Sequence, residues 1–427
     1  MIPASRSHPW HAWVESWFLS YAFLGASVAG LAPILLPLSV AKSGSVVDIG
    51  LVVAAFNLGG LSAPTWGELA DRRGLHRSLL ISGLLATSIA LAVFPFASSL
   101  TARLVLALAQ GSGAASAATV ANLFIVEVHP RPEWDERIGW LQTFYGAGQV
   151  LGLLLAGVVG GADLKLGFLI ASGMTFAACI PAMYLKGKIR KAHIPRPVLA
   201  YPSHHSGFSA GSPQSFYHRF SLKALKHLIR SFASPLGIFL FAWLMSFAGA
   251  AAFFSMYPIL MKQVYGVEPS LSSIGFAIAA AVGLFLYAPA GAWSQQYGPM
   301  RVLRVAFVVR VVAFLVLLIV GLVRIEAAGS IALISFVLIV VAWSLMSVTG
   351  TEIIAQSSEA NEGEGLGLFN ASTAIAGVIG AVIGGWSAGI WGYQIVSVLG
   401  IVGVSGALFL TSIVNILGKN EAQKVKE

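Results

Sequence analysis

The stretch GELADRRGLHR, residues 67–77, is the densest charge cluster in the first half of the chain and separates two long apolar runs. Two membrane helices joined by so short a turn must enter and leave the bilayer on the same side, and the three arginines indicate that this side is the cytoplasm. The glycines allow the turn to be tight. A carboxylate in the last turn of a helix, followed by arginines, can hold a neighbouring helix terminus and release it when the helices move. The stretch therefore predicts a charged latch at a membrane surface.

The composition excludes a soluble protein. Of the 427 residues, 57% are hydrophobic and 10% are charged, and the mean hydropathy is +0.82. A soluble core could not enclose so many apolar residues. The apolar runs are about 20 residues long, which predicts membrane-spanning helices, whereas a membrane barrel would show short alternating segments. The net charge of +9 lies in short loops beside these runs, so it indicates membrane orientation rather than nucleic-acid binding.

Windowed apolarity predicts twelve spans in two groups of six. They are expected at residues 14–40, 46–69, 78–96, 101–128, 138–160 and 167–185, and at residues 233–260, 270–293, 302–323, 331–354, 366–390 and 393–417. Pro33 and Pro37 are expected to bend the first span. With both termini cytoplasmic, 20 of the 26 Lys and Arg residues fall on the cytoplasmic side and 5 on the other. This bias supports an even number of spans.

A polar segment divides the chain into two halves. Residues 186–231 are basic and rich in His, Pro and Ser, too hydrophilic to span a membrane and too poor in apolar residues to form a core. Within this segment, Phe216–Phe232 has an apolar stripe beside a basic one, which predicts a helix lying on an anionic membrane surface. We therefore expect a six-helix bundle over residues 1–185, a cytoplasmic linker, and a second six-helix bundle over residues 232–427.

The two halves repeat each other. The spacing of residues 67–77 recurs at residues 291–301, and two further matches lie in nearly the same register. The matched pairs are Gly67 with Gly291, Gly74 with Gly298, Arg77 with Arg301, Leu141 with Leu366, and Glu127 with Glu352, while Gln295 stands in the place of Asp71. Three matches in one register predict duplication of a six-helix unit.

The stretch at residues 67–77 resembles the signature loop between helices 2 and 3 of the major facilitator superfamily, Gly-x-x-x-Asp-Arg-x-Gly-x-x-Arg. The matching residues are Gly67, Asp71, Arg72, Gly74 and Arg77. The resemblance implies an all-α membrane protein with twelve transmembrane helices in two pseudo-symmetric six-helix bundles that rock around a central site. Two features depart from the pattern of its drug/proton antiporters. Ala107 replaces an arginine that usually precedes the Gln110-Gly111 pair, and the glycine-rich fifth span lacks a Gly-Pro pair.

We expect Asp71 and Glu127 to meet at the cytoplasmic ends of helices 2 and 4, with Arg72 or Arg77 bridging them, because unpaired charges near hydrocarbon are costly. The alternative is a static anchor that only sets topology. The second-half counterpart comprises Gly291, Gln295, Gly298, Arg301 and Glu352. Since Gln295 carries no charge, that latch should be the weaker one.

Three carboxylates are candidate protonation sites, namely Glu15, Glu127 and Glu352. A carboxylate must be partly desolvated to titrate near neutral pH, so Glu15 and Glu352 have the alternative of being ordinary interfacial residues. Asp48 is expected to cap the second helix. All nine histidines fall in predicted cytoplasmic segments, which excludes a histidine relay at the midplane. No metal site is predicted.

The resemblance places a substrate cavity between helices 1, 4, 7 and 10, with help from 2, 5, 8 and 11. Its polar candidates, each with the alternative of being interhelical hydrogen bonding alone, are Tyr21, Asn57, Gln110, Asn122, Gln142, Tyr145, Gln149, Trp243, Tyr257, Trp343 and Asn370. These helices carry no Lys or Arg at midspan, which disfavours a dianionic substrate. Arg310 lies on helix 9, which usually faces lipid, so it is expected to snorkel toward the cytoplasmic interface.

We conclude that the chain is a secondary transporter of a small organic solute. The leading hypothesis is proton-linked efflux of apolar or amphipathic compounds by an antiporter. The alternatives are an importer of a neutral metabolite such as a sugar or nucleoside, and a membrane sensor or scaffold that transports nothing. We expect no enzymatic activity, no cofactor beyond a coupling proton, no nucleic-acid partner, and a monomer in the plasma membrane with both termini cytoplasmic.

Overall fold

The computed structural model describes residues 13–130, 133–159, 163–185, 235–323, 325–357 and 362–424, without the side chains of residues 71, 135, 355, 357, 362–367 and 414–424. The first half comprises α1 (Phe18–Leu24), the π-helical segment η2 (Gly25–Leu31), α2 (Ala32–Ala41), α3 (Val46–Gly60), α4 (Ala63–Arg73), α5 (His76–Val93), the 3-10 segment η3 (Phe94–Phe96), α6 (Leu100–Val128), α7 (Trp134–Val159), α8 (Leu164–Ala177) and α9 (Cys179–Ala182). The second half comprises α11 (Pro235–Tyr265), α12 (Pro269–Tyr297), α13 (Pro299–Val323), α14 (Ala328–Ser357), α15 (Glu362–Trp391) and α16 (Ile395–Lys424).

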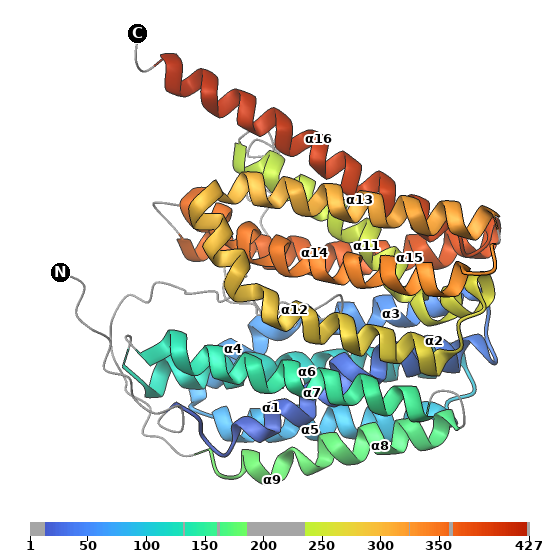
Figure 1. Cartoon of the computed structure of the whole chain (residues 1–427). Coiled ribbons are helices and arrows are strands. Elements are labelled where there is room, and N and C mark those ends of the chain that lie inside the picture. The colour runs from blue at the N-terminus through green and yellow to red at the C-terminus, as the bar shows by residue number, and fades with distance from the viewer. Residues whose placement is uncertain are drawn as a thin grey trace.

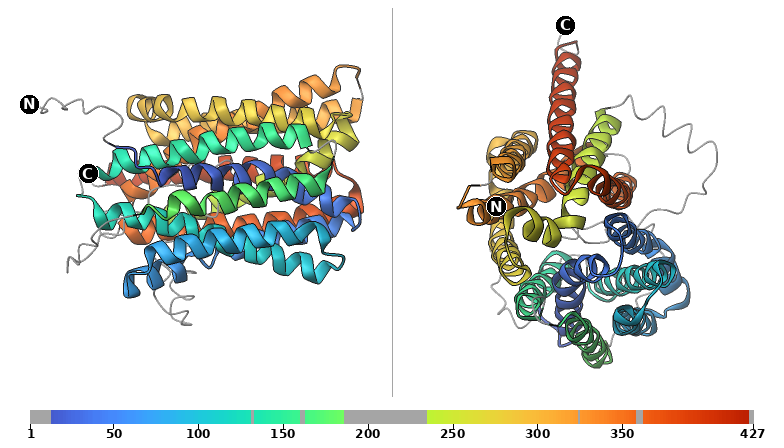
Figure 2. Two further views of the ribbon diagram at one scale, coloured as in Figure 1. Left: turned by 90° about the horizontal axis from the view of Figure 1, so that it is seen from below. Right: turned by 90° about the vertical axis from the view of Figure 1, so that its right-hand side faces the viewer.

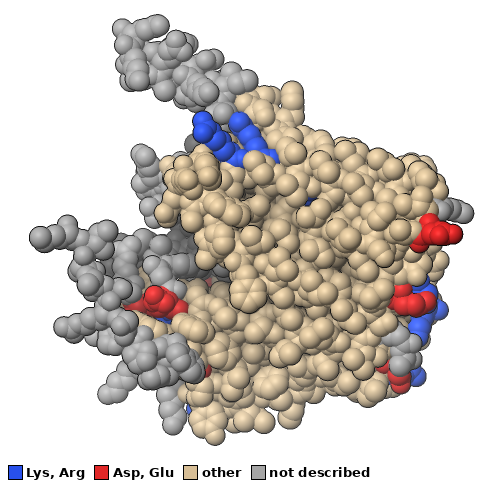
Figure 3. Space-filling view, in the orientation of Figure 1, with Lys and Arg blue, Asp and Glu red and all other residues tan. Residues whose placement is uncertain are grey.

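Within these residues, twelve helices are long and apolar enough to cross a membrane. Their ends differ from the predicted ones by five residues or fewer. The helices run side by side in two bundles (Figure 1), and the view along their axes separates the bundles clearly (Figure 2). The face seen in Figure 3 is a broad belt free of charge, with the visible charged side chains near its ends, as a membrane-spanning protein requires. The predicted fold class is confirmed.

We call the end of the bundle that holds the α4–α5 turn, residues 73–76, the signature end. The opposite end, which holds the α2–α3 connection at residues 42–45, is called the far end. The predicted linker and its amphipathic helix, Phe216–Phe232, lie outside the described residues.

The first span is irregular before its prolines. A proline has no N–H to donate, so Pro33 and Pro37 cannot close the usual helical hydrogen bonds. The π-helical segment η2 immediately precedes Pro33. It places backbone close to α7: a Cβ on Gly25 would lie 2.2 Å from the Tyr145 carbonyl oxygen, and one on Gly148 would lie 1.9 Å from that of Ala22. The glycines of the fifth span therefore serve as close packing sites for the first.

At the far end, Ser45 is the N-cap of α3 and forms a reciprocal capping box with Asp48. The Asp48 backbone N–H donates to Ser45 Oγ at 3.2 Å, and the Ser45 N–H donates to Asp48 Oδ2 at 2.7 Å. This confirms the predicted cap.

The two halves meet through α3 with α15 and through α7 with α12. A Cβ on Gly50 would lie 2.3 Å from the Ala381 carbonyl oxygen, and one on Gly157 would lie 3.1 Å from that of Ser270. Nearer the midplane, Asn57 Nδ2 donates to the Gly377 carbonyl oxygen at 3.3 Å. Among the described residues, Gly50, Gly157, Gly385 and Gly389 approach the other half between the midplane and the far end, and Gly146 approaches Leu284 of α12 near the midplane. The halves therefore pack closely against each other toward the far end.

Candidate functional site

The signature stretch forms the turn that its glycines predict. α4 ends at Arg73, and Gly74 follows in the left-handed region with φ of 63°, which favours glycine. Gly67 lies within van der Waals reach of Thr119, because a Cβ there would be 3.3 Å from the Thr119 methyl carbon. Arg72 is exposed and pairs with Glu68 one turn earlier. Arg77 is also exposed, and the Asp71 side chain lies outside the described residues.

The buried partner of Glu127 is a histidine that the sequence analysis did not single out. His76, the first residue of α5, places Nε2 3.0 Å from Glu127 Oε2 near the end of α6. The two side chains are 3% and 4% exposed. The Phe124 ring lies 6.4 Å from the imidazole, one turn before Glu127. The prediction had favoured Arg72 or Arg77 as the bridge. Instead, both arginines point to the surface, because α5 begins at residue 76 and turns His76 toward α6.

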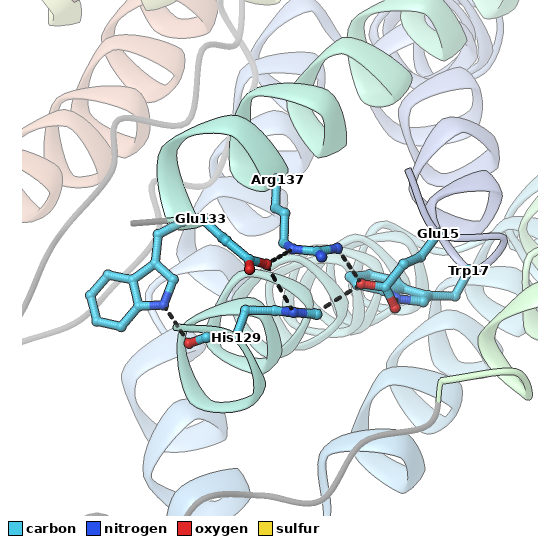
Figure 4. A network of polar contacts seen from close by, with 6 residues as sticks. Glu15, Trp17, His129, Glu133 and Arg137 are labelled. Atoms are coloured by element: carbon cyan, nitrogen blue, oxygen red, sulfur yellow. Dashed lines mark hydrogen bonds and ion pairs between the residues drawn. The ribbon is translucent and has the colours of Figure 1, made fainter. Parts of the chain in front are cut away.

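A second polar network ties three segments together at the signature end (Figure 4). Arg137 donates to Glu133 Oε2 at 2.9 Å and to Glu15 Oε1 at 3.0 Å. His129 Nε2 lies 2.9 Å from Glu15 Oε1, and Trp17 Nε1 donates to Glu15 Oε2 at 2.9 Å. Burial lowers the pKa of His129 and Arg137 lowers it further, although Glu15 and Glu133 act in the opposite direction. At neutral pH, Arg137 is therefore the cation between two carboxylates.

This geometry favours the interfacial interpretation of Glu15. Its side chain is 27% exposed and joins the start of the first span to the α6–α7 turn. A double-mutant cycle of Glu15→Gln and Arg137→Gln should give a coupling energy of about 1–2 kcal/mol, because each variant removes the same charge-assisted hydrogen bond. Thermal unfolding of the purified protein measures it. Fully additive losses would show that the two residues act independently.

The second half repeats the turn but not the ion pair. Gly298 has φ of 88°, as its match to Gly74 predicts, but a Cβ on Gly291 would meet nothing within 4 Å. Glu352 accepts a hydrogen bond from Ser294 of α12 and another from Gln356 Nε2 at 3.1 Å. Gln295 and Arg301 are exposed. The matched carboxylates thus have different partners, an imidazole for Glu127 and a hydroxyl for Glu352.

Four of the predicted cavity residues lie together in the first half. The Tyr21 and Tyr145 rings are 5.0 Å apart between α1 and α7. Asn122 Nδ2 donates to the Tyr21 hydroxyl at 3.4 Å, and Gln142 Nε2 donates to Asn122 Oδ1 at 3.3 Å. We call Tyr21, Asn122, Gln142 and Tyr145 the amide cluster. It offers hydroxyl and amide groups and carries no charge.

Two other predicted residues belong to an aromatic group in the second half. The Trp243 ring lies 5.8 Å from Trp343 and 4.4 Å from Phe369, and Trp343 lies 5.3 Å from Phe247. Trp243 Nε1 donates to Thr373 Oγ1 at 2.8 Å, which fixes the indole. We call Trp243, Phe247, Trp343 and Phe369 the aromatic cluster. Phe247 and Phe369 gave no signal in an apolar sequence, since aromatic side chains are common in membrane helices.

The remaining cavity candidates are distributed elsewhere. Gln110 and Gln149 are buried, Asn370 is buried near the aromatic cluster on α15, and Asn57 bridges the halves. Tyr257 donates to the Ser272 carbonyl oxygen at 2.8 Å and stacks on Phe336 with ring centroids 3.9 Å apart. It is therefore part of a phenylalanine-rich core rather than of either cluster.

The prediction that Arg310 snorkels toward the membrane interface is wrong. The residue is 1% exposed and lies against Trp343 and Met346 of α14. The side chain turns into the second bundle because its position on α13 faces α14. Helix number alone, which suggested a lipid-facing position, could not reveal this rotation.

Comparison with known proteins agrees with this architecture. The family model described as Major Facilitator Superfamily matches residues 17–380. No protein of curated function matches the chain. Among solved structures, a point mutant of the nucleoside transporter NupG superposes with a TM-score of 0.72 at 12% identity, over 94% of this chain and 98% of that chain. The D-xylose-proton symporter gives 0.66 at 15% identity, over 92% and 95%.

A bacterial homologue of the human lysosomal transporter Spinster, in an inward-facing and unoccupied conformation, gives a TM-score of 0.66 at 14% identity, over 95% of this chain and 98% of that chain. At these identities the likeness shows the fold alone. The family model covers most of the chain, and the twelve spans and the signature turn agree with it. The chain therefore belongs to the major facilitator superfamily.

Proposed function

We propose that this protein moves a small organic solute across a membrane by alternating access between its two halves. The observation that carries the proposal is the close approach of the two halves at glycines from the midplane to the far end, with the Asn57 hydrogen bond beside it. At the signature end, the described ion pairs of the first half, His76 with Glu127 and Arg137 with Glu15, lie within that half. Two rigid bundles joined toward one end can rock about a central site.

In this proposal the signature end lies on the cytoplasmic side of the plasma membrane, and both termini are cytoplasmic. The exposed Arg72, Arg73 and Arg77 at that end support the orientation, because cytoplasmic loops carry the excess of basic residues. We propose that the protein acts as a monomer, because one chain contains both bundles between which the solute would bind.

The leading candidate activity is proton-linked efflux of an amphipathic organic compound. The aromatic cluster supplies stacking surface, and the amide cluster supplies a few hydrogen-bonding groups. That combination suits a solute with an apolar body and a small polar part. The coupling proton is assigned to Glu127, because its side chain is more buried than that of Glu15 and is paired with an imidazole.

Import of a neutral metabolite is the second candidate. The hydroxyl and amide groups of Tyr21, Asn122 and Gln142 could bind the hydroxyls of a sugar or nucleoside. Two of the similar structures are a nucleoside transporter and a xylose-proton symporter, so this candidate uses a substrate class that the fold carries elsewhere.

Flux into proteoliposomes under an imposed pH gradient tests both candidates. Radiolabelled uridine and xylose report import of a neutral metabolite, and a fluorescent amphipathic dye reports efflux. Proton-linked efflux predicts that the dye moves in the direction opposite to proton flow. It also predicts that xylose and uridine are not accumulated. Protein-free liposomes are the control. If no compound moves and none shifts the melting temperature of the purified protein, the transport proposal fails and a sensor or scaffold replaces it.

A further inference from the structure

The second bundle holds a charged side chain at the depth where a transported solute would bind. Arg310 lies about 16 Å along α13 from the first residue of that helix, from the 1.5 Å rise per residue. Its side chain is 1% exposed, so neither water nor lipid reaches it. A charge inside a membrane bundle is costly and usually has a function.

The partners of this guanidinium are weak. Arg310 Nη1 lies 3.3 Å from the Met346 sulfur, and its central carbon lies 6.0 Å from the Trp343 ring centroid. A thioether is a poor hydrogen-bond acceptor, and an aromatic ring offers only partial compensation for a full charge. Arg310 Nε is buried without a hydrogen-bond partner.

The acidic side chains described in the second half are engaged elsewhere or lie near the ends of the bundle. Glu268 pairs with Lys262 at 3.2 Å, and Glu352 accepts from Ser294 and Gln356. Glu326 lies exposed in the turn between α13 and α14. Among the described side chains, therefore, no carboxylate neutralises Arg310, which leaves a buried charge of the kind that strongly favours an anion.

A second unsatisfied donor lies beside the first. Trp343 Nε1 is buried without a hydrogen-bond partner, and the centroid of its ring lies 6.0 Å from the central carbon of the Arg310 guanidinium. Two buried donors on neighbouring side chains, both without an acceptor, favour a ligand that brings a negatively charged hydrogen-bond acceptor. Trp343 also lies against Phe247 and Trp243 of the aromatic cluster, so the apolar part of a bound molecule has an aromatic surface close by.

We propose that Arg310 and Trp343 bind the single anionic group of an organic solute whose flat apolar body lies against the aromatic cluster. The proposal rests on the proposed transport function and specifies its substrate class as organic monoanions. A dianion is disfavoured because the nearest basic residue on the same helix, Arg304, donates instead to the Thr411 carbonyl oxygen at 2.6 Å. The absence of midspan cations on the cavity-lining helices disfavours a dianion, and Arg310 adds one cation at that depth on a different helix.

Direct binding to the purified full-length protein tests this assignment. The probes are radiolabelled benzoate, a flat monoanion, and benzamide, its neutral analogue of the same shape. We expect benzoate to bind saturably. Benzamide should bind with an affinity at least about tenfold lower, because one charge-assisted hydrogen bond provides a ratio of that size. Arg310→Met should abolish benzoate binding and Arg310→Lys should weaken it. Arg304→Gln, on the same helix, should leave it unchanged. Equal binding of the two probes, or no binding of benzoate, would overturn the proposal.

The stability of the ligand-free protein gives an independent measurement. Because Arg310 is a buried charge with weak partners, Arg310→Met should raise the melting temperature of the ligand-free protein. A lower melting temperature would show that the arginine maintains the fold, against the proposal. Repeating the measurements in gluconate and in chloride buffers separates an organic anion from chloride. If chloride alone stabilises the wild type as much as benzoate does, the organic-anion assignment is wrong.

Flux measurements distinguish this failure from failure of the transport proposal. If the wild type and Arg310→Met move a neutral or cationic compound equally well and benzoate does not bind, the protein is a transporter and the monoanion assignment is wrong. If no compound moves, the proposed transport function itself fails.

Discussion

Gly50→Val is expected to reduce transport about tenfold or more while leaving both bundles folded. A Cβ at this position would lie 2.3 Å from the Ala381 carbonyl oxygen and 2.8 Å from the Gly385 Cα of α15, where nothing can move without separating the halves. Overpacking of this kind costs about 1–3 kcal/mol. A destabilisation of that size is enough to lower the population of the state with a closed far end about tenfold. The matched control is Gly173→Val, because a Cβ at Gly173 meets nothing within 4 Å.

The same variant should open the far end to solvent, and cysteine labelling can detect this. The native chain has one cysteine, Cys179, which is buried, so Cys179→Ala gives a cysteine-free background. A Val47→Cys probe on α3 faces Gly389 of α15 in the closed contact. Labelling of this probe by a membrane-impermeant maleimide should be faster in Gly50→Val than in Gly173→Val. Equal labelling together with normal flux would show that the α3–α15 contact is not a gate.

His76→Leu is expected to reduce flux about tenfold or more without reducing membrane insertion. Glu127 and His76 form a pair with both side chains nearly inaccessible, and leaving one buried polar group without its partner typically costs about 1–3 kcal/mol. The loss of this pair affects flux only if the pair breaks and forms again during the transport cycle. Proteoliposome flux per inserted protein measures the loss.

Glu127→Gln tests the proposed coupling proton. If Glu127 carries that proton, flux through this variant should no longer depend on the pH gradient.

The adjacent arginine is the matched control for this pair. Arg77 follows His76 directly but is exposed, so Arg77→Gln should leave flux nearly unchanged. Asp71→Asn tests the signature carboxylate and should reduce flux while sparing insertion. If Arg77→Gln were as harmful as His76→Leu, the surface arginines would form the latch after all. Unchanged flux in both His76→Leu and Asp71→Asn would exclude a switch at this end.

The twelve spans were predictable because membrane insertion depends on the mean hydropathy of windows about 20 residues long. Neighbouring helices hardly alter that average. The largest differences occur where a helix continues past its apolar stretch, as α16 does to Lys424 and α11 to Tyr265. Backbone hydrogen bonding extends a helix into polar sequence, and hydropathy does not register that extension.

Individual contacts were less predictable, and the two histidines show why. His76 and His129 were excluded as midplane relays because they lie at the ends of spans, and the structure does place them there. Yet each contacts a carboxylate, Glu127 or Glu15, on another segment. Their partners depend on the rotation of α5 against α6 and on the course of the chain before α1, neither of which hydropathy reveals.

The sequence by itself predicted twelve membrane spans, two halves that share a common spacing of glycine, arginine and glutamate, and a tight charged turn between helices 2 and 3. These properties follow from local hydropathy, glycine placement and the distribution of basic residues. The tertiary structure alone decided that His76 rather than an arginine meets Glu127, and that Arg310 turns inward against Trp343. The physical reason is that a residue's environment in a bundle depends on helix rotation and packing. In a membrane helix every face is apolar, so the hydropathy pattern does not show which face points into the bundle.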